Sequence, residues 1–479
     1  AWNQLALSCF LPIASEFFDA TPINYYLRKQ TTFISLKENI RQIFSVARRY
    51  GIYKFRILGP SNKELKVNLI AATNYAQYFE SKRALELFEY KGIRIGDLVY
   101  DQYLRAAGKP TVDFTDPLFI LKLAEALSFV DSTVRYFDKN LVRAVCVSHT
   151  VYSLAIPIRV AIKREIAAFQ VNGESIYRLS SSNSHAYTDF KFYRSKFKKL
   201  DSSLRQNGIA EAKTRLDRRL SGEVGVDMPY STASAYSTKN YNNFELKKTG
   251  KISILVAVHD FFDSPHSYGD NLFPDFLEWL ECLAEMSSKT NYEWYIKTHP
   301  DVVGNSEEVL KELVLKNKNF TLVPKEVSHH QLIKEGISVV LTVFGTIAAE
   351  YAYLGKLAVN ASINNPHIAY EFCLNPKTVE EYKAIILNLP SLIESFKPDT
   401  QQILEFYFMH NIYKQKTWML QDLDHALQVL GGYSRLLDWR IVPYFFESGN
   451  STKLMDIPTS IKTFLKSGDF VFGREHFSQ

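Results

Sequence analysis

The chain has 479 residues, of which 46% are hydrophobic, 23% charged and 14% aromatic. This length predicts about two to three domains, and the ordinary globular composition excludes global disorder. Glycine is sparse, with 20 residues, which excludes collagen-like and glycine-rich linker proteins. The formal net charge of +6 is small for this length, and only residues 191–199 (KFYRSKFKK) approach a basic face. We therefore expect no nucleic-acid partner, and interpret that segment as a solvated helix face or a contact with an anionic membrane.

Cysteine usage and hydropathy indicate the compartment. Cys9, Cys146, Cys282 and Cys373 lie far apart and form no CxxC pair, which favours buried thiols in a reducing compartment over disulfides or a zinc site. No apolar run approaches the ~18 residues of a membrane-spanning helix. The apolar N-terminal segment has no basic residues ahead of it, unlike a signal peptide. We expect a cytoplasmic protein with at most peripheral membrane contact.

The first half of the chain predicts one clear α/β unit. Residues 53–58 (YKFRIL) and 141–147 (LVRAVCV) are short segments typical of strands. The second run ends in Ser148-His149, and the amphipathic pattern over residues 152–169 predicts a helix after it. In such units the functional groups collect at the carboxyl end of the strand. From residue 180 to 243 the composition shifts to Ser, Tyr, Asn and basic residues, which we interpret as helices and loops crossing between domains.

The second half predicts a doubly wound parallel sheet. Residues 252–258 (ISILVAV) form a continuous apolar run of the kind found in buried parallel strands. Strands and helices then alternate, with strands expected at residues 294–297, 320–323, 339–342 and 357–360, and helices at residues 273–286, 331–335 and 347–354. Beyond residue 375 the chain is predicted to be mostly helical.

This order of elements predicts the α/β class with a GT-B-like architecture, in which two Rossmann-type domains face a cleft and a helical segment ends the chain. We expect an acceptor-side domain over residues 1–245 and a nucleotide-sugar-binding domain over residues 246–375. Residues 376–479 are expected to be helices that pack across both domains.

Two motifs at predicted strand ends suit an anionic ligand. In Lys297-Thr298-His299-Pro300, Lys297 and His299 share one face of a strand at the carboxyl edge of the sheet, although a lone histidine there is more often structural. In the second motif, Gly345 permits a tight turn and Thr346 is expected to cap a helix whose N–H groups can take a phosphate. Glu350 follows one turn later, where its carboxylate can accept hydrogen bonds from a ribose.

An HP dipeptide followed by G-T-x-A-x-E, together with residues 258–269 (VHDFFDSPHSYG) and 405–410 (EFYFMH), resembles bacterial capsule and lipopolysaccharide GT-B transferases that use CMP-activated acidic sugars. These include capsule Kdo transferases and polysialyltransferases. The retaining β-Kdo transferase module of O-antigen synthases is the most similar group. The resemblance covers mainly residues 250–415. It implies a CMP-β-Kdo donor, with His299 and Thr346 near the CMP; Lys297 and Glu350 are added from spacing.

Retention by double displacement requires a carboxylate nucleophile. Asp227 is the first candidate because its glycine-containing loop precedes the second domain and can approach a sugar from the acceptor side. Asp263, after the first strand of that domain, is the second. His259 and His266 are then expected to bind the Kdo carboxylate and hydroxyls or to transfer protons. A loop Asp that makes an Asx turn is the alternative for either carboxylate.

On the acceptor side we expect His149, Arg159 and Glu223, each of which has a structural role as its alternative. The Asp422-Leu423-Asp424 string resembles a metal-binding DxD motif, but it lies in a helical segment and is interpreted as a solvated face. No metal or other cofactor is expected, because positive groups and helix N–H dipoles can stabilise the leaving CMP.

The expected function is transfer of Kdo from CMP-β-Kdo to a saccharide of a lipopolysaccharide O-antigen or capsule glycan. The expected partners are the CMP-activated donor, a lipid-linked or oligosaccharide acceptor, and other modules of a synthase. One alternative is an inverting GT-B enzyme that uses CMP-sialic acid or CDP-glycerol. The other is a catalytically silent module that binds glycan.

Overall fold

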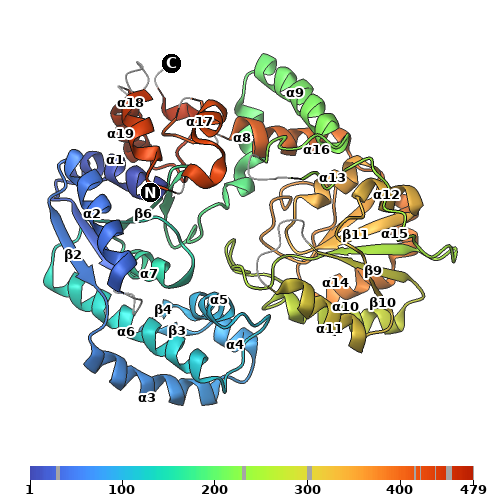
Figure 1. Ribbon diagram of the computed structural model, residues 1–479, viewed down its shortest axis with the longest axis horizontal. Helices are drawn as coiled ribbons and strands as arrows, with labels where there is room; N and C mark the ends of the chain where they lie inside the picture. Colours follow the sequence, from blue (N-terminus) through green and yellow to red (C-terminus); the bar gives the residue numbers. More distant parts are fainter. Residues whose placement is uncertain are drawn as a thin grey trace. The chain divides into compact units, whose positions relative to one another are not determined.

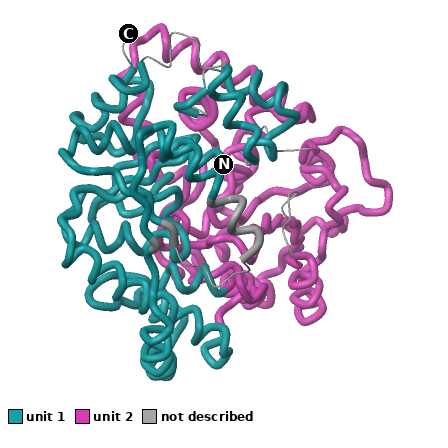
Figure 2. The backbone as a smooth tube through the Cα atoms, turned by 60° about the vertical axis from the view of Figure 1, so that its left-hand side comes forward, with its two compact units in different colours: residues 1–103, 113–187, 415–479 teal, residues 104–112, 188–414 magenta. Residues whose placement is uncertain are grey.

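The computed structural model describes residues 1–27, 33–228, 233–298, 305–414, 417–420, 422–436, 438–448 and 456–477. It has the expected α/β class, with helices around several sheets (Figure 1). The chain divides into two compact units (Figure 2). Unit 1 contains residues 1–103, 113–187 and 415–479, and unit 2 contains residues 104–112 and 188–414.

The sheets of unit 1 are small and mixed. Its central sheet has the order β5-β6-β7, in which β5 and β6 are parallel and β7 is antiparallel to β6. The described strands of this unit are β1 (Ile23–Leu27), β2 (Lys54–Leu58), β3 (Glu89–Tyr90), β4 (Ile93–Arg94), β5 (Ala144–Val147), β6 (Ala167–Val171) and β7 (Ile176–Leu179). Its described helices are α1 (Trp2–Phe17), α2 (Phe33–Arg49), α3 (Asn62–Tyr78), α4 (Lys82–Glu86), α5 (Gly96–Ala107), which runs on into unit 2, α6 (Pro117–Lys139), α7 (Ile156–Lys163), α17 (Leu423–Leu430), α18 (Ile441–Ser448) and α19 (Asp456–Ser467).

The helix expected over residues 152–169 is wrong in its second half. A short 3-10 turn leads into α7, which ends at Lys163, and Glu165 turns the chain with a φ of +58°. Residues 167–171 then form β6, which pairs with β5 from Ala144↔Ala167 onward. A five-residue segment is too short to show a clear periodicity, and here the neighbouring strand determines its conformation.

Unit 2 contains the parallel sheet that the sequence predicts. Its strands are β8 (Ser253–Ala257), β9 (Glu293–Lys297), β10 (Phe320–Leu322), β11 (Ile337–Thr342) and β12 (Leu357–Asn360), in the order β10-β9-β8-β11-β12 with every pair parallel. Its described helices are α8 (Tyr193–Lys199), α9 (Ser202–Leu220), α10 (Phe276–Lys289), α11 (Ser306–Lys316), α12 (His329–Glu335), α13 (Ile347–Tyr353), α14 (Val379–Leu387), α15 (Leu389–Ser395) and α16 (Thr400–Tyr407), followed by a π-helical segment over Phe408–Tyr413.

Two hydrophobic cores cover the faces of this sheet. Leu255 packs on one face with residues of α9, α12, α13 and α16. Ile254 and Val256 point to the opposite face and pack with residues of α10, α11 and α14. This alternation follows from the two-residue period of a strand, and burial on both faces explains the unbroken apolar run of β8.

The unit boundaries differ from those expected, because two segments pack elsewhere. Helix α9 joins unit 2, where Leu216 and Leu220 enter the core and Gly208 leaves room for the ring of Phe408, which would lie 2.5 Å from a Cβ at that position. The end of the chain joins unit 1, where the indole N–H of Trp418 donates to the Asn172 carbonyl (2.6 Å). No helix in the described ranges is both long and apolar enough to cross a membrane.

A buried hydrogen bond in unit 2 provides a test of this packing. The indole N–H of Trp279 donates to the Tyr382 hydroxyl at 2.9 Å, and both side chains are fully buried. Replacing Tyr382 by Phe leaves the indole N–H unsatisfied, so we expect the free energy of unfolding to fall by about 1–3 kcal/mol. Urea unfolding measures the change.

The matched control is Tyr292→Phe, because the Tyr292 hydroxyl makes an exposed, long contact with the Leu387 carbonyl (3.4 Å). We expect its effect to stay below about 0.5 kcal/mol. Equal effects of the two substitutions would contradict the buried hydrogen bond.

Candidate active site

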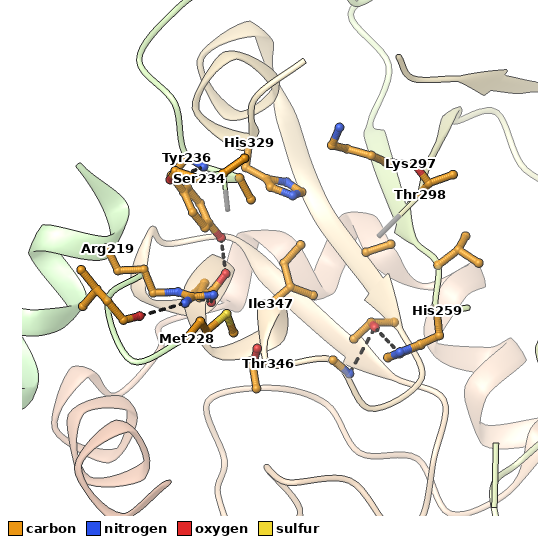
Figure 3. A pocket seen from close by; sticks show the side chains of 18 of the residues that line it. Arg219, Met228, Ser234, Tyr236, His259, Lys297, Thr298, His329, Thr346 and Ile347 are labelled. Atoms are coloured by element: carbon orange, nitrogen blue, oxygen red, sulfur yellow. Dashed lines mark hydrogen bonds and ion pairs between the residues drawn. The ribbon is translucent and has the colours of Figure 1, made fainter. Parts of the chain in front are cut away.

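The candidate site lies where the connections of the unit 2 sheet change direction. From β8 the chain adds β9 and β10 on one side, and β11 and β12 on the other. In open parallel sheets, the diverging loops at this switch point leave a crevice beyond the carboxyl ends of the strands. A pocket of about 150 Å³ occurs at this place, lined by the ends of β8, β9 and β11, the start of α13 and parts of residues 219–236 (Figure 3).

Lys297 supplies a buried cation to the pocket. It ends β9, its exposed fraction is 5%, and its ammonium group donates to the carbonyls of Pro324 (3.2 Å) and Lys325 (3.0 Å). Burial lowers the pKa of Lys297 to about 8, with Glu326 acting in the opposite direction. An ammonium group has three N–H donors, so these carbonyls leave one to donate to an anion in the pocket.

A buried ion pair forms the opposite part of the lining. Arg219, from the end of α9, donates to one Glu350 oxygen through Nε (2.8 Å) and Nη2 (2.7 Å). The Tyr236 hydroxyl donates to the other oxygen at 2.5 Å. Figure 3 shows Arg219 and Tyr236 converging from different segments. The carboxylate of Glu350 therefore holds the end of α9 and Tyr236 against α13, and a ribose hydroxyl would be an additional donor to it.

Two histidines line the pocket with their rings held in place. Nε2 of His259 accepts from the Phe344 backbone N–H (3.3 Å), so in the neutral ring we assign the proton to Nδ1. The His259 ring packs on Phe276 and Phe344. His329 faces the Tyr351 hydroxyl through Nδ1 (2.8 Å), and its backbone N–H donates to the Ala235 carbonyl (2.9 Å). Contacts with neighbouring residues therefore fix the orientation of both rings.

The turn after β11 is tight, as expected for Gly345. A Cβ at this glycine would lie 2.8 Å from the Thr342 hydroxyl oxygen, which also accepts from the Gly345 N–H (3.3 Å). Thr346 lines the pocket but makes no side-chain cap on α13, so the expected capping role is wrong. Its helical φ of −60° and ψ of −16° explain this, because a capping residue needs extended backbone.

Asp227 lies beside the pocket in a conformation imposed by its neighbours. Its φ is +56°, its side chain is 3% exposed, and its carboxylate accepts from Arg215 (2.9 Å) and from the Tyr407 hydroxyl (2.8 Å). The adjacent residues Val226 and Met228 line the pocket. Two partners on different helices, α9 and α16, thus fix the position of this carboxylate next to the pocket.

The other candidates of unit 2 are placed differently. Asp263 is 75% exposed, lies 3.8 Å from Arg105 and is not among the residues that line the pocket. His266, in the same loop, is buried at 3% exposure and is likewise outside the lining. Glu223 does line the pocket, where its exposed carboxylate pairs with Arg218. His299 lies outside the described residues.

The two acceptor-side candidates of unit 1 lie in the β5–α7 region. His149 follows β5 and contacts the Ser148 hydroxyl through Nδ1 (3.0 Å). Arg159 is 8% exposed, donates to Asp97 at 2.6 Å and lies 3.2 Å from His185. The Asp97–Arg159 pair favours a structural role for Arg159. The Asp422-Leu423-Asp424 string also has a local role, because Asp422 caps α17 by accepting from the His425 N–H (2.9 Å).

Arg219, Tyr236 and His329 were missed by the sequence analysis. The first two lie in the segment taken as a crossing between domains, where apolar periodicity is weak. His329 had one local signal, the adjacent His329-His330 pair after Ser328, whose hydroxyl caps α12 by accepting from the Gln331 N–H (3.2 Å). Their partners are distant in sequence, so only the folded chain brings them to the pocket.

No family model matches the chain, and no curated protein matches it. Similar solved structures include a Thermosulfurimonas dismutans KpsC described as a β-Kdo 2,7 transferase (13% identity, TM-score 0.34, covering 58% of this chain and 80% of that chain). Another is the β-Kdo 2,4 transferase of the same KpsC (12%, 0.33, covering 55% and 78%). A third is the UDP-GlcNAc 2-epimerase of Neisseria meningitidis (9%, 0.25, covering 85% and 94%).

The Glu350 ion pair gives a prediction that needs no ligand. Glu350→Gln leaves the guanidinium of Arg219 buried without a counter-charge, so we expect the free energy of unfolding to fall by roughly 3 kcal/mol. Chemical unfolding measures it. Glu223→Gln is the control, because its pair with Arg218 is exposed, and we expect no measurable change. Similar stabilities of the two variants would contradict a buried pair.

Proposed function

We propose that the chain is a glycosyltransferase that moves Kdo from CMP-β-Kdo to a saccharide of a lipopolysaccharide O-antigen or capsule glycan. The observation that carries the proposal is the pocket at the switch point of the unit 2 sheet, with the buried cation of Lys297 at its wall. Its walls include Gly345, Thr346 and Glu350 of one motif on which the resemblance to CMP-dependent transferases rests. They also include Lys297 and Thr298, which directly precede the His299-Pro300 dipeptide of the other motif in the sequence.

In the proposed complex, the CMP phosphate lies against Lys297 and the turn at Gly345-Thr346, with His299 following Thr298 in the chain. The third N–H of the ammonium group and the backbone N–H groups of the turn donate to phosphate oxygens, which stabilise the leaving CMP without a divalent cation. The rings of Tyr236 and His329, whose centroids are 5.3 Å apart, provide a surface for the nucleoside.

Asp227 is the proposed nucleophile. A carboxylate oxygen attacks the anomeric carbon of Kdo, the bond from that carbon to the CMP oxygen breaks, and CMP leaves with the electron pair. An acceptor hydroxyl then attacks the same carbon, its proton passes to a base such as the Glu223 carboxylate, which lines the pocket, and the aspartate is regenerated. Two features support Asp227 over Asp263: its carboxylate is held in place by Arg215 and Tyr407, and its neighbours line the pocket.

The second candidate function is inverting transfer from CMP-sialic acid or CDP-glycerol. It is favoured by the engagement of both Asp227 oxygens, which must partly leave their donors before the carboxylate can attack. In that reaction a base takes the acceptor proton while the acceptor attacks directly, and no covalent adduct forms.

Covalent trapping distinguishes these functions. After incubation with CMP-Kdo, we expect intact-protein mass spectrometry to show a mass gain of one Kdo on the unaltered chain and none on Asp227→Asn, because an amide is not a nucleophile. Asp263→Asn is the matched control and should keep the adduct. CMP release with acceptor but without an adduct would favour inverting transfer. Absence of both, with CMP still bound, would indicate a glycan-binding module.

CMP binding should depend on the charge of Lys297. Its ammonium form binds phosphate, so we expect the affinity to fall as the pH rises through about 8 and the group loses its proton. Lys297→Met should lower the affinity by roughly 10- to 100-fold at neutral pH and remove this pH dependence. Calorimetric titration with CMP measures both.

Lys311→Met is the control for that titration. Lys311 lies on the same unit, but it is exposed and pairs with Glu307 on α11. We expect this variant to bind CMP like the unaltered chain at each pH. Retained pH dependence in Lys297→Met would place the responsible group elsewhere.

A further inference from the structure

Helix α3 of unit 1 presents apolar side chains to solvent. Val67, Ile70 and Tyr78 are 61%, 69% and 80% exposed, and they recur at positions i, i+3 and i+11, which lie on one face of a helix. In Figure 1, α3 forms an outer edge of its unit, with α6 on its inner side. A solvated helix normally has a polar outer face, so this apolar stripe requires an explanation.

The orientation of α3 is set by its opposite face. The Asn68 amide donates to Ser128 (2.9 Å) and to Asp131 (3.1 Å) on α6. Ala72 and Ala76 are buried on the same side. Rotation of the helix to bury the apolar stripe would break these buried contacts, so the stripe stays outward in the folded unit.

The charge on the outer face is positive. Lys63 and Lys66 are exposed at the start of the stripe. Glu64 is the acidic residue of this helix, and it is turned aside: it accepts from the Ser61 N–H (2.7 Å) in a capping box and pairs with Arg135 on α6. The stripe therefore combines two cations, three large exposed side chains and the exposed amide of Asn74, and α3 contributes no carboxylate to it.

We propose that this face of α3 docks on a bilayer surface that contains anionic lipid headgroups. Val67 and Ile70 enter the boundary between headgroups and acyl chains, the Tyr78 ring lies at the same level, and the two lysines contact lipid phosphates. The absence of an acid from the stripe favours an anionic surface over a neutral protein partner. This proposal does not depend on the proposed function.

Vesicle sedimentation with the full chain tests the proposal. We expect binding to phosphatidylcholine vesicles that contain phosphatidylglycerol, weaker binding to phosphatidylcholine alone, and loss of binding with added salt. Lys63→Gln/Lys66→Gln should lower partitioning onto the anionic vesicles by about tenfold or more. Val67→Ser/Ile70→Ser should lower it similarly on both kinds of vesicle, because the apolar insertion is lost.

Leu315→Ser is the matched control. Leu315 is 66% exposed on α11, but that helix has Glu307, Glu308 and Glu312, so we expect no change in vesicle binding. Circular dichroism and CMP binding check that each variant is folded and keep this test separate from catalysis. Equal partitioning of all variants, or no vesicle binding at all, would overturn the proposal. Self-association that the serine variant abolishes would instead make the stripe an interface between copies of the chain.

Discussion

The parallel pairing of β8 with both β9 and β11 is the constraint on which the candidate site depends. Because both neighbours run in the same direction as β8, their carboxyl ends meet at one edge of the sheet. The loops after β8 and β11 and the last residue of β9 are brought together there, although they are separated by tens of residues in the chain. Without this register, His259, Lys297 and Gly345 would not line one pocket.

The sheet alone does not complete the pocket. Part of the remaining wall comes from residues that precede β8. The cluster of Arg219, Glu350 and Tyr236 joins these residues to α13. A buried carboxylate that accepts from two different donors is costly to leave unpaired, so the cluster favours one position of this segment. The Asp227 contacts to Arg215 and Tyr407 have the same effect on the neighbouring loop. Electrostatic pairing thus shapes the pocket together with the hydrophobic cores.

The two units differ in how much of their structure local patterns could predict. In unit 2, long apolar runs buried on both faces are unambiguous, and the predicted strands agree with the observed ones to within about two residues. In unit 1, the predicted helix over residues 152–169 includes the first residues of β6, because so short a segment has no distinguishing period. The prediction that Thr346 caps α13 was wrong for a related reason. Threonine is a favoured capping residue, but the backbone conformation at its position decides whether its side chain can cap the helix.

The α/β class, the parallel sheet of β8 to β12, and the places of Lys297 and Gly345 at its carboxyl edge could all be predicted from the sequence alone. These are local properties, set by strand burial, turn chemistry and chain order. Three outcomes emerge only in the folded chain. Helix α9 and Tyr236 belong to the pocket, and Arg159 pairs with Asp97. Asp227 is enclosed, whereas Asp263 is exposed. Those outcomes depend on contacts between residues far apart in the chain, whose partners leave no periodic trace in the sequence.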